Sequence, residues 1–300
     1  MDLLNRLAVR TLPLIPTPVM RKLASRYIAG EALDDALQRL RQLQGKGFPG
    51  ILDLLGEDVT GEAAARQVVQ DYAAAARAVA EAGIDAYVSV KPTHVGLRLS
   101  EELCRDMYAE LARTCASLGL EMRVEMEDHT TTDGTLRVFE ALRREHENVG
   151  IVLQSRLFRT EADIDALAPG PLWVRMVKGI YLEPPAIAHE DPEPIRDAFV
   201  DRSRQLLERG ARVSFATHDE LLAERLIALC NELGVAPERY EFQVLLGVRE
   251  PLWSTWSKAG HTVRVYVPYG PEWRAYSSRR LNKNPQIFGH LMRDLLIPGR

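Results

Sequence analysis

The sequence has few of the residues and patterns that mark several large classes of protein. Cys104, Cys115 and Cys230 are the only cysteines in 300 residues, and no pair forms Cys-x-x-Cys. We therefore expect buried thiols, no disulfide framework and a cytoplasmic location. No apolar stretch reaches about 18 residues, so no membrane-spanning helix is expected. Lys and Arg number 38 against 42 Asp and Glu, and the formal charge of −4 argues against a nucleic-acid partner.

Motifs for metal, phosphate and nucleophile chemistry are also missing. The seven histidines show no His-Glu-x-x-His spacing, so we expect no metal. No P-loop and no Gly-x-Ser-x-Gly elbow occurs. The segment GKGFPG (45–50) fits the dinucleotide pattern Gly-x-Gly-x-x-Gly, but it precedes an apolar run instead of following one into a helix. We interpret that occurrence as chance.

What the chain does contain is an alternation of short apolar runs with amphipathic segments. The runs are 47–55, 85–92, 121–127, 149–155, 172–179, 212–218, 240–247 and 262–270. Helices are expected at 60–83, 100–119, 133–146, 160–167, 191–210, 219–234 and 250–260, with a last one beginning near Pro271. This alternation predicts parallel βα units, and eight units can close into a TIM-like (β/α)8 barrel, regular or distorted. A doubly wound open sheet is the structural rival, and it needs a nucleotide motif after its first strand.

The alternation begins only after a different N-terminal segment. Leu33, Leu37, Leu40 and Leu43 recur at helical spacing ahead of the first run. We therefore expect an N-terminal helical arm at 1–46 and one catalytic domain, a barrel with a C-terminal helix, at 47–300.

Polar and charged side chains lie near the ends of the runs where a barrel carries its chemistry. They are Lys91, Glu125, Glu127, Gln154, Ser155, Arg175, Lys178, Thr217, His218 and Gln243, with Leu245 and Tyr266 on the last two runs. A charge inside a barrel is costly unless it is paired or used. An internal salt-bridge network of Lys91, Glu125 and Arg175 without chemistry is the alternative. Because these charges gather at one end of the expected barrel, we favour a functional site over such a network.

Strand alternation makes finer predictions about these side chains. Glu125 and Glu127 share parity, so both should face one side with Met126 opposite. Arg175 and Lys178 differ in parity, so they should point apart unless the strand ends between them. In the final helix, Arg279 and Arg280 are three and four residues after Tyr276, so all three lie close together on its surface. Two adjacent guanidiniums are suited to bind one carboxylate or phosphate.

Taken together, these segments resemble the proline dehydrogenase family, and in particular its small monofunctional bacterial members. The similarity covers roughly residues 47–295. It is carried, in order, by VSVKPTHVGL, VEMED, VLQS, VRMVKGIY, FATHD, EFQVLLG, VRVYVPYG and YSSRR. Each segment alone is weakly specific, but the ordered set is specific.

The resemblance implies a role for each position. Glu125 and Arg175 would be catalytic, with Arg175 also near the flavin. The residues in contact with the substrate would be Lys91, Leu245, Tyr266, Tyr276, Arg279 and Arg280. The last three would bind the substrate carboxylate. The residues in contact with the cofactor FAD would be Met126, Gln154, Arg175, Lys178, Gly179, Ile180, Thr217 and His218.

The same resemblance implies a reaction and its partners. L-proline would be oxidised to Δ1-pyrroline-5-carboxylate by hydride transfer to flavin N5, the first step of proline catabolism. Lys91 would pair with Glu125 or orient the substrate. Electrons would pass to a quinone-type acceptor, with brief peripheral contact on the inner face of the membrane. The oligomeric state stays open.

Three positions depart from the family pattern. Glu125 stands where the family usually has Asp, Ile180 where it has Ala, and Lys283 where an acid often follows the two arginines. Two other functions remain as alternatives. A Schiff-base aldolase would use Lys91 or Lys178 as nucleophile, and a binding barrel would have no activity.

Overall fold

The computed structural model describes residues 20–21, 24–274 and 276–277, and within them eight parallel strands close into one barrel. The strands are β1 (Gly50–Leu54), β2 (Ala86–Val90), β3 (Met122–Val124), β4 (Val149–Gln154), β5 (Trp173–Val177), β6 (Arg212–Ala216), β7 (Tyr240–Leu245) and β8 (Val263–Tyr269). Each strand pairs with the next, and β8 closes on β1. The predicted barrel is confirmed, and the open sheet is excluded.

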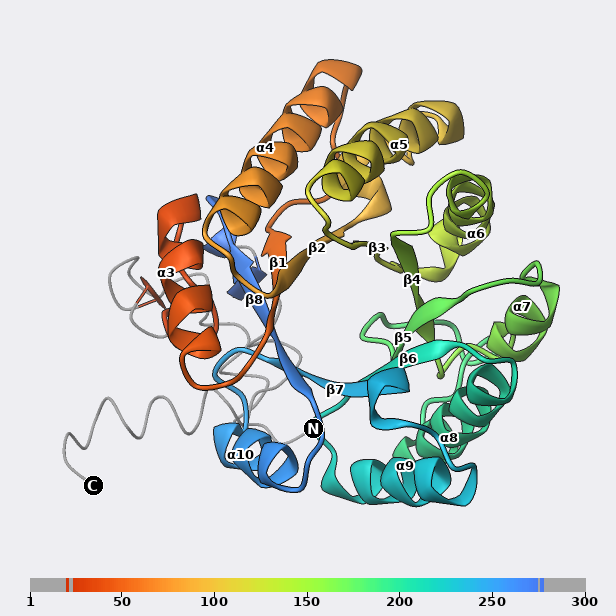
Figure 1. Cartoon of the computed structure of the whole chain (residues 1–300). Coiled ribbons are helices and arrows are strands. Elements are labelled where there is room, and N and C mark those ends of the chain that lie inside the picture. The colour runs from red at the N-terminus through yellow and green to blue at the C-terminus, as the bar shows by residue number, and fades with distance from the viewer. Residues whose placement is uncertain (1–19, 22–23, 275, 278–300) are drawn as a thin grey trace, which may run out of the picture.

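Helices form a ring around the strands (Figure 1). They are α3 (Leu33–Gln44), α4 (Glu62–Glu81), α5 (Glu101–Ser117), α6 (His129–Arg143), α7 (Thr160–Ala166), α8 (Pro192–Glu208), α9 (Glu220–Glu232) and α10 (Glu250–Lys258), with short 3-10 turns η2 (Pro92–Val95) and η3 (Pro237–Arg239). Most of these helices begin and end within about two residues of the predicted segments.

Side-chain caps explain where several helices begin. Ser100 accepts from the backbone of Leu103 at the start of α5, and Asp219 accepts from Leu222 at the start of α9. Our prediction for α6 was wrong in its start. The helix begins at His129, four residues before the expected start at Asp133. It begins there because the Asp128 carboxylate caps it by accepting a hydrogen bond from the Thr130 backbone.

Strand alternation divides the apolar residues into two populations. One face of each strand packs against the helices in a single large core, for example through Val88, Val124 and Val265. The other face lines the barrel interior, where Ile51, Tyr87, Trp173 and Tyr266 form a separate cluster. The interior is filled by side chains rather than open.

The N-terminal segment is tied to the barrel in two places. Leu37, Leu40 and Leu43 of α3 belong to the large core between strands and helices, so the expected boundary at residue 46 falls inside continuous packing. Met20, Ala24, Tyr27 and Ile28 instead form a small cluster with Leu55 and Trp273.

All three cysteines are free and buried, as predicted. Among the helices of the described ranges, none is both long and apolar enough to cross a membrane.

Candidate functional site

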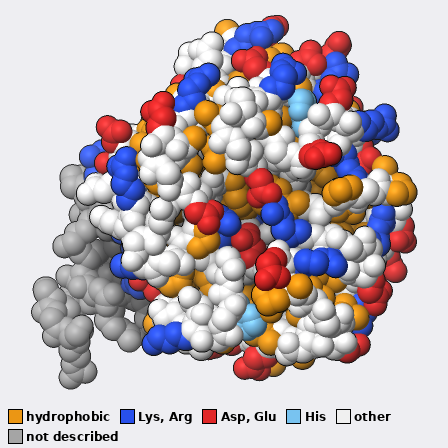
Figure 2. All heavy atoms as spheres, viewed as in Figure 1, with side chains coloured by type: hydrophobic (Ala, Val, Ile, Leu, Met, Phe, Trp, Pro, Cys, Tyr) orange, Lys and Arg blue, Asp and Glu red, His pale blue; other side chains and the backbone are white. Residues whose placement is uncertain are grey.

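Buried charges of opposite sign meet inside the barrel near the carboxyl ends of the strands. We call this group the site layer, and it consists of Asp53, Lys91, Glu125, Arg175 and Tyr266. Asp53, Lys91 and Arg175 have the parity of the inward residues Ile51, Tyr87 and Trp173 of their own strands, and Tyr266 belongs to that inward cluster. Glu125, just after β3, contacts Arg175 and Tyr266 and so lies on the same side. Figure 2 shows acidic and basic side chains gathered at the centre of one face of the molecule, among hydrophobic ones.

Glu125 is the centre of the site layer. Its carboxylate oxygens both lie 3.3 Å from Arg175 Nη1. Ser89 Oγ donates to Glu125 Oε1 at 2.5 Å, and the Tyr266 hydroxyl donates to the same oxygen at 3.2 Å. The Arg175 guanidinium also lies 5.0 Å from the centre of the Tyr266 ring. One carboxylate therefore joins side chains from three strands, β2, β5 and β8.

Lys91 has a different partner from the one we predicted. Its ammonium lies 3.2 Å and 3.4 Å from the two oxygens of Asp53, whereas the expected partner Glu125 pairs with Arg175. A carboxylate on β1, that of Asp53, forms the pair instead. Asp53 was missed by the sequence reasoning, although a single acid at an inward position of the apolar run GILDLL was the signal.

The charges of the site layer stabilise one another against burial. Burial alone would lower the pKa of Lys91, but Asp53, Glu125 and Glu127 together outweigh it and raise the pKa. Burial likewise works against Arg175, yet Glu125 and the neighbouring phenols raise its pKa. Burial raises the pKa of Asp53 despite the Lys91 charge. The two cations therefore stay protonated, and each is already matched to a carboxylate.

Glu127 lies beyond the end of β3 at the barrel rim, where its partner is Thr93; that it faces the same side as Glu125 stays a prediction. It accepts from the Thr93 backbone at 2.9 Å and from the Thr93 hydroxyl at 2.8 Å, and burial raises its pKa. Its backbone carbonyl accepts from Gln154 Nε2 at 2.7 Å. Met126 points the opposite way, into the large core, so its side chain is outside the barrel interior.

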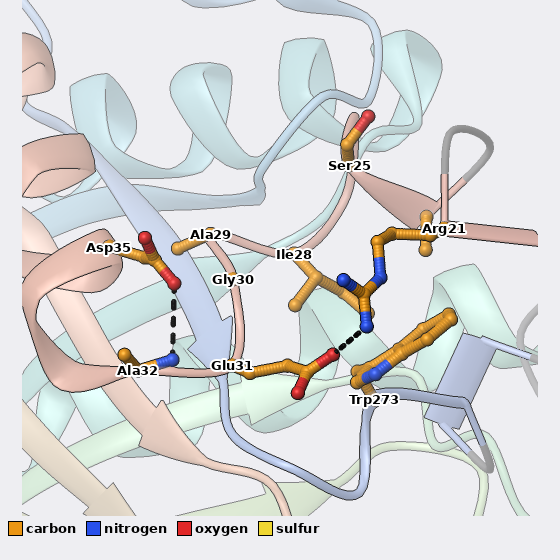
Figure 3. A pocket seen from close by; sticks show the side chains of 10 residues that line it. Arg21, Ser25, Ile28, Ala29, Gly30, Glu31, Ala32, Asp35 and Trp273 are labelled. Atoms are coloured by element: carbon orange, nitrogen blue, oxygen red, sulfur yellow. Dashed lines mark hydrogen bonds and ion pairs between the residues drawn. The ribbon is translucent and has the colours of Figure 1, made fainter. Parts of the chain in front are cut away.

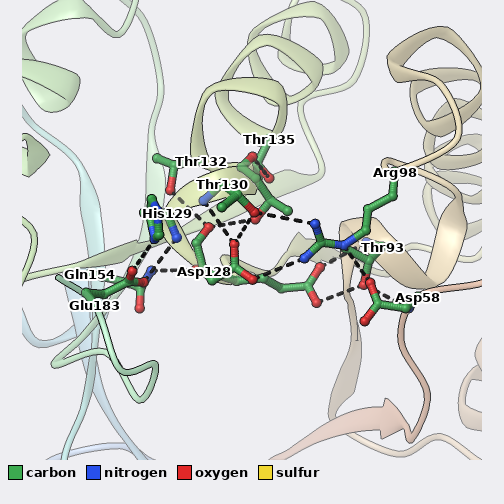
Figure 4. Close-up of polar contacts among 12 residues, drawn as sticks. Asp58, Thr93, Arg98, Asp128, His129, Thr130, Thr132, Thr135, Gln154 and Glu183 are labelled. Atoms are coloured by element: carbon green, nitrogen blue, oxygen red, sulfur yellow. Dashed lines mark hydrogen bonds and ion pairs between the residues drawn. The ribbon is translucent and has the colours of Figure 1, made fainter.

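A chain of polar contacts continues along this rim (Figure 4). Arg98 Nε donates to Asp58 at 2.7 Å, and its Nη2 donates to Asp128 at 3.1 Å. Glu183 accepts from the backbone of His129 at 3.1 Å, and its other oxygen lies 2.5 Å from His129 Nδ1. These bonds connect the loops after β1, β2, β3 and β5, so they hold half of the barrel mouth in one arrangement.

The loop after β5 carries three of the expected cofactor residues. Lys178 lies 2.5 Å from Asp219, whereas Arg175 pairs with Glu125. Because β5 ends at Val177, between these two residues, strand parity does not decide the direction of Lys178. Arg196 lies 2.7 Å from Asp219 as well, and Lys178 and Arg196 outweigh burial and lower the pKa of Asp219 to about 2. Gly179 has φ +95°, and a Cβ there would lie 2.8 Å from Gln154 Oε1. The Ile180 side chain is 66% exposed, so its extra bulk is accommodated.

The remaining expected residues lie around the ends of β6, β7 and β1. Thr217 is buried and its hydroxyl accepts from the Asp219 backbone at 3.1 Å. The ring of His218 accepts from the Leu245 backbone at 2.8 Å, which joins the ends of β6 and β7. Tyr276 packs against the small cluster that contains Leu55. Arg279, Arg280 and Lys283 lie outside the described residues.

Charges also lie at the other end of the barrel, which our prediction of charges gathered at one end overlooked. We call these residues the lower layer: Tyr87, Arg123, Trp173, Arg212, Glu241 and Arg264. Arg264 Nε donates to Glu241 at 3.0 Å. The Arg123 guanidinium lies 3.8 Å from the centre of the Trp173 ring and 5.0 Å from that of Tyr87.

A pocket of about 340 Å³ lies apart from the site layer, beside the start of α3 (Figure 3). Arg21 pairs with Glu31 at 2.6 Å across it and lies 5.6 Å from the Trp273 ring centre. Asp35 accepts from the Ala32 backbone at 3.1 Å. Because these charged and polar groups already pair with one another, we favour the barrel mouth over this pocket as the binding site of a polar ligand.

Comparisons with known proteins agree with this geometry. A family model described as proline dehydrogenase matches residues 36–291. The chain is 36% identical over 286 residues to the proline dehydrogenase of Deinococcus radiodurans, covering 92% of this chain and 91% of the other. It is 31% identical over 265 residues to proline dehydrogenase 2 of Bacillus subtilis (strain 168), covering 88% of each.

A solved structure shares the fold. Proline utilization A from Bdellovibrio bacteriovorus, inactivated by N-propargylglycine, superposes with a TM-score of 0.84 at 24% identity. The superposition covers 94% of this chain and 37% of that longer one.

Proposed function

This chain belongs to the proline dehydrogenase family, and on that premise we propose that its barrel mouth binds L-proline and FAD side by side. It is an enzyme that oxidises proline in proline catabolism. Enzymes of this family are flavin-dependent. The identity of the flavin, the product Δ1-pyrroline-5-carboxylate, the residue roles and a quinone-type electron acceptor are our proposals.

The residues after β5 fit a flavin. Gly179 lets the side chains of Gln154 and Arg156 lie against the backbone of the β5 loop, where a Cβ would be only 2.8 Å from each, so the Gln154 amide is held beside this loop as a polar partner for a cofactor. Arg175 Nε is buried and has no partner among the described residues, which leaves a donor for a further acceptor. Gln154, Thr217 and His218 would line the same cofactor site, with Lys178 and Ile180 along the β5 loop. Met126 would contribute through its backbone.

The substrate would lie between the site layer and the C-terminal helix. Lys91 and Arg175 are already paired with Asp53 and Glu125, so a substrate carboxylate needs further cations. We assign that role to Arg279 and Arg280, which can bind a carboxylate bidentately. Tyr266, Leu245 and Tyr276 would pack against the apolar ring of proline.

A bound flavin would supply the acceptor at N5 for a hydride from the proline carbon beside nitrogen. This chain's residues would provide position, charge and exclusion of water rather than a strong base. Glu125 holds the Arg175 guanidinium, whose positive charge would stabilise electron density that develops at the cofactor. Tyr266 is fixed by the same carboxylate, so substrate and cofactor would share one rigid frame.

The observation that carries the proposal is the Glu125 carboxylate, which joins Arg175 and Tyr266 near the carboxyl ends of the barrel strands. The test is an absorbance spectrum of the purified protein before and after anaerobic addition of L-proline. We expect flavin bands that bleach with proline and not with D-proline. Protein that stays colourless after FAD is supplied would contradict the cofactor. Borohydride trapping of substrate on Lys91 or Lys178 would instead support an aldolase.

A further inference from the structure

Ser89 lies on the inner face of β2, two residues after Tyr87 and two before Lys91, which directly follows the strand. It is completely buried, and a hydroxyl in that position costs free energy unless it has a partner. Its partner is Glu125 Oε1 at 2.5 Å, the shortest of the contacts that this oxygen makes. Ser89 touches neither Arg175 nor Tyr266 in a hydrogen bond among the described contacts, yet Glu125 binds all three.

Glu125 needs such a partner more than a shorter acid would. A glutamate has one more rotatable bond than an aspartate, so its carboxylate can swing without movement of the strand. Arg175 Nη1 is 3.3 Å from both oxygens, so this contact does not distinguish Oε1 from Oε2. Two hydroxyls on Oε1, from β2 and β8, define which oxygen faces which strand.

We propose that Ser89 is a positioning residue for the reaction, because it fixes the Glu125 carboxylate in the orientation that holds Arg175 and Tyr266. The proposal rests on the function proposed above. Without the Ser89 hydroxyl, Glu125 turns about its last bond, and the guanidinium and the phenol lose their common anchor. Both groups then sample positions that are less suited to hydride transfer.

The chain contains a matched control. Ser214 on β6 is also completely buried, and its hydroxyl also donates to a glutamate, Glu241, at 3.1 Å. That glutamate belongs to the lower layer. Ser214 pairs with Arg175 in the β5–β6 register, but its hydroxyl contacts Glu241 and Arg123 of the lower layer and not Glu125. Ser214→Ala therefore removes the same group from the same barrel interior without removing a Glu125 contact.

The experiment compares Ser89→Ala with Ser214→Ala in the full-length holoprotein. For Ser89→Ala we expect kcat for proline to fall about tenfold with KM changed less than threefold, and the flavin midpoint potential to shift measurably. For Ser214→Ala we expect neither change. Equal effects of the two variants on kcat and on the potential would overturn the proposal.

A second comparison tests the link through Glu125. Glu125→Asp withdraws the carboxylate from β2, so Ser89→Ala should cost less than threefold in that background. If it costs the same tenfold, Ser89 acts without Glu125 and the proposal is wrong. If Ser89→Ala does not fold, Ser89→Cys keeps the size with a weaker donor and should give an intermediate kcat; a wild-type kcat and potential in that variant would also overturn the proposal. Failure of the wild type to reduce its flavin with proline would contradict the proposed function itself.

Discussion

Two layers of charged side chains lie inside this barrel, and they are built differently. In the site layer, Glu125 and Asp53 each bind a cation, and Tyr266 adds its hydroxyl. In the lower layer, Arg264 and Arg212 also pair with carboxylates, those of Glu241 and Glu121. Arg123 has no ion pair among the described residues, and its guanidinium lies 3.8 Å from the Trp173 ring centre. Aromatic faces satisfy a guanidinium without leaving a position for substrate. Neither buried charge nor its pairing alone therefore marks chemistry, whereas its place near the carboxyl ends of the barrel strands does.

The largest effect should come from an arginine of the site layer. Arg175→Met removes the charge beside the proposed cofactor site, and we expect kcat for proline to fall about 100- to 1,000-fold. Arg212→Met, at the lower end of the neighbouring strand, should leave kcat within about twofold of wild type. Steady-state kinetics of both variants measure the difference. Similar losses in both would remove the functional distinction between the layers.

The next effect concerns pH and stability near the site layer. Burial, together with the Lys91 charge, lowers the pKa of His94 from 6.5 to about 4. Between these values the unfolded chain binds a proton that the folded protein does not. Stability should therefore fall as the pH drops from 6.5 to 4, by up to about 1.4 kcal/mol per pH unit.

His94→Gln should remove most of that slope in urea unfolding curves measured from pH 4 to 7. His261, beside the lower end of β8, is the comparison. Burial lowers its pKa as well, but it is only partly buried, so His261→Gln should remove less of the slope. A larger effect at His261 would contradict this assignment.

A glycine at the barrel mouth should show a smaller, specific effect. Gly179→Ala forces a Cβ within 2.8 Å of Gln154 and Arg156 at φ +95°. Gly210 has φ +83° with nothing within 4 Å of a Cβ, so Gly210→Ala measures the backbone cost alone. Both should lose about 1 kcal/mol of stability. Only Gly179→Ala should also weaken flavin binding, by about tenfold in a titration of apoprotein. Equal flavin affinity in the two variants would mean that the flavin does not bind beside Gly179.

Sequence patterns predicted the fold far better than the pairing inside it. Period-two alternation and helical spacing are local properties, so the strands and most helix limits could be derived from the chain alone. The Lys91–Asp53 pair depends on which strands become neighbours after the barrel closes, and on the distance between two side chains across it. The Asp128 cap that starts α6 was likewise hidden, because Asp128 follows two other acids of the same segment.

The smallest expected effect tests the lower layer directly. Arg123 makes one long hydrogen bond, 3.4 Å to Ser214, while its Nε and Nη1 have no partner among the described residues, and burial lowers its pKa. Removing such a charge relieves a desolvation cost, while loss of the two ring contacts offsets part of the gain. Arg123→Met should therefore raise the free energy of unfolding by about 1 kcal/mol in urea titrations and leave kcat within twofold. A tenfold loss of activity with an intact fold would instead mean that the positive charge below Glu125 contributes to the reaction, and the two layers would form one electrostatic unit.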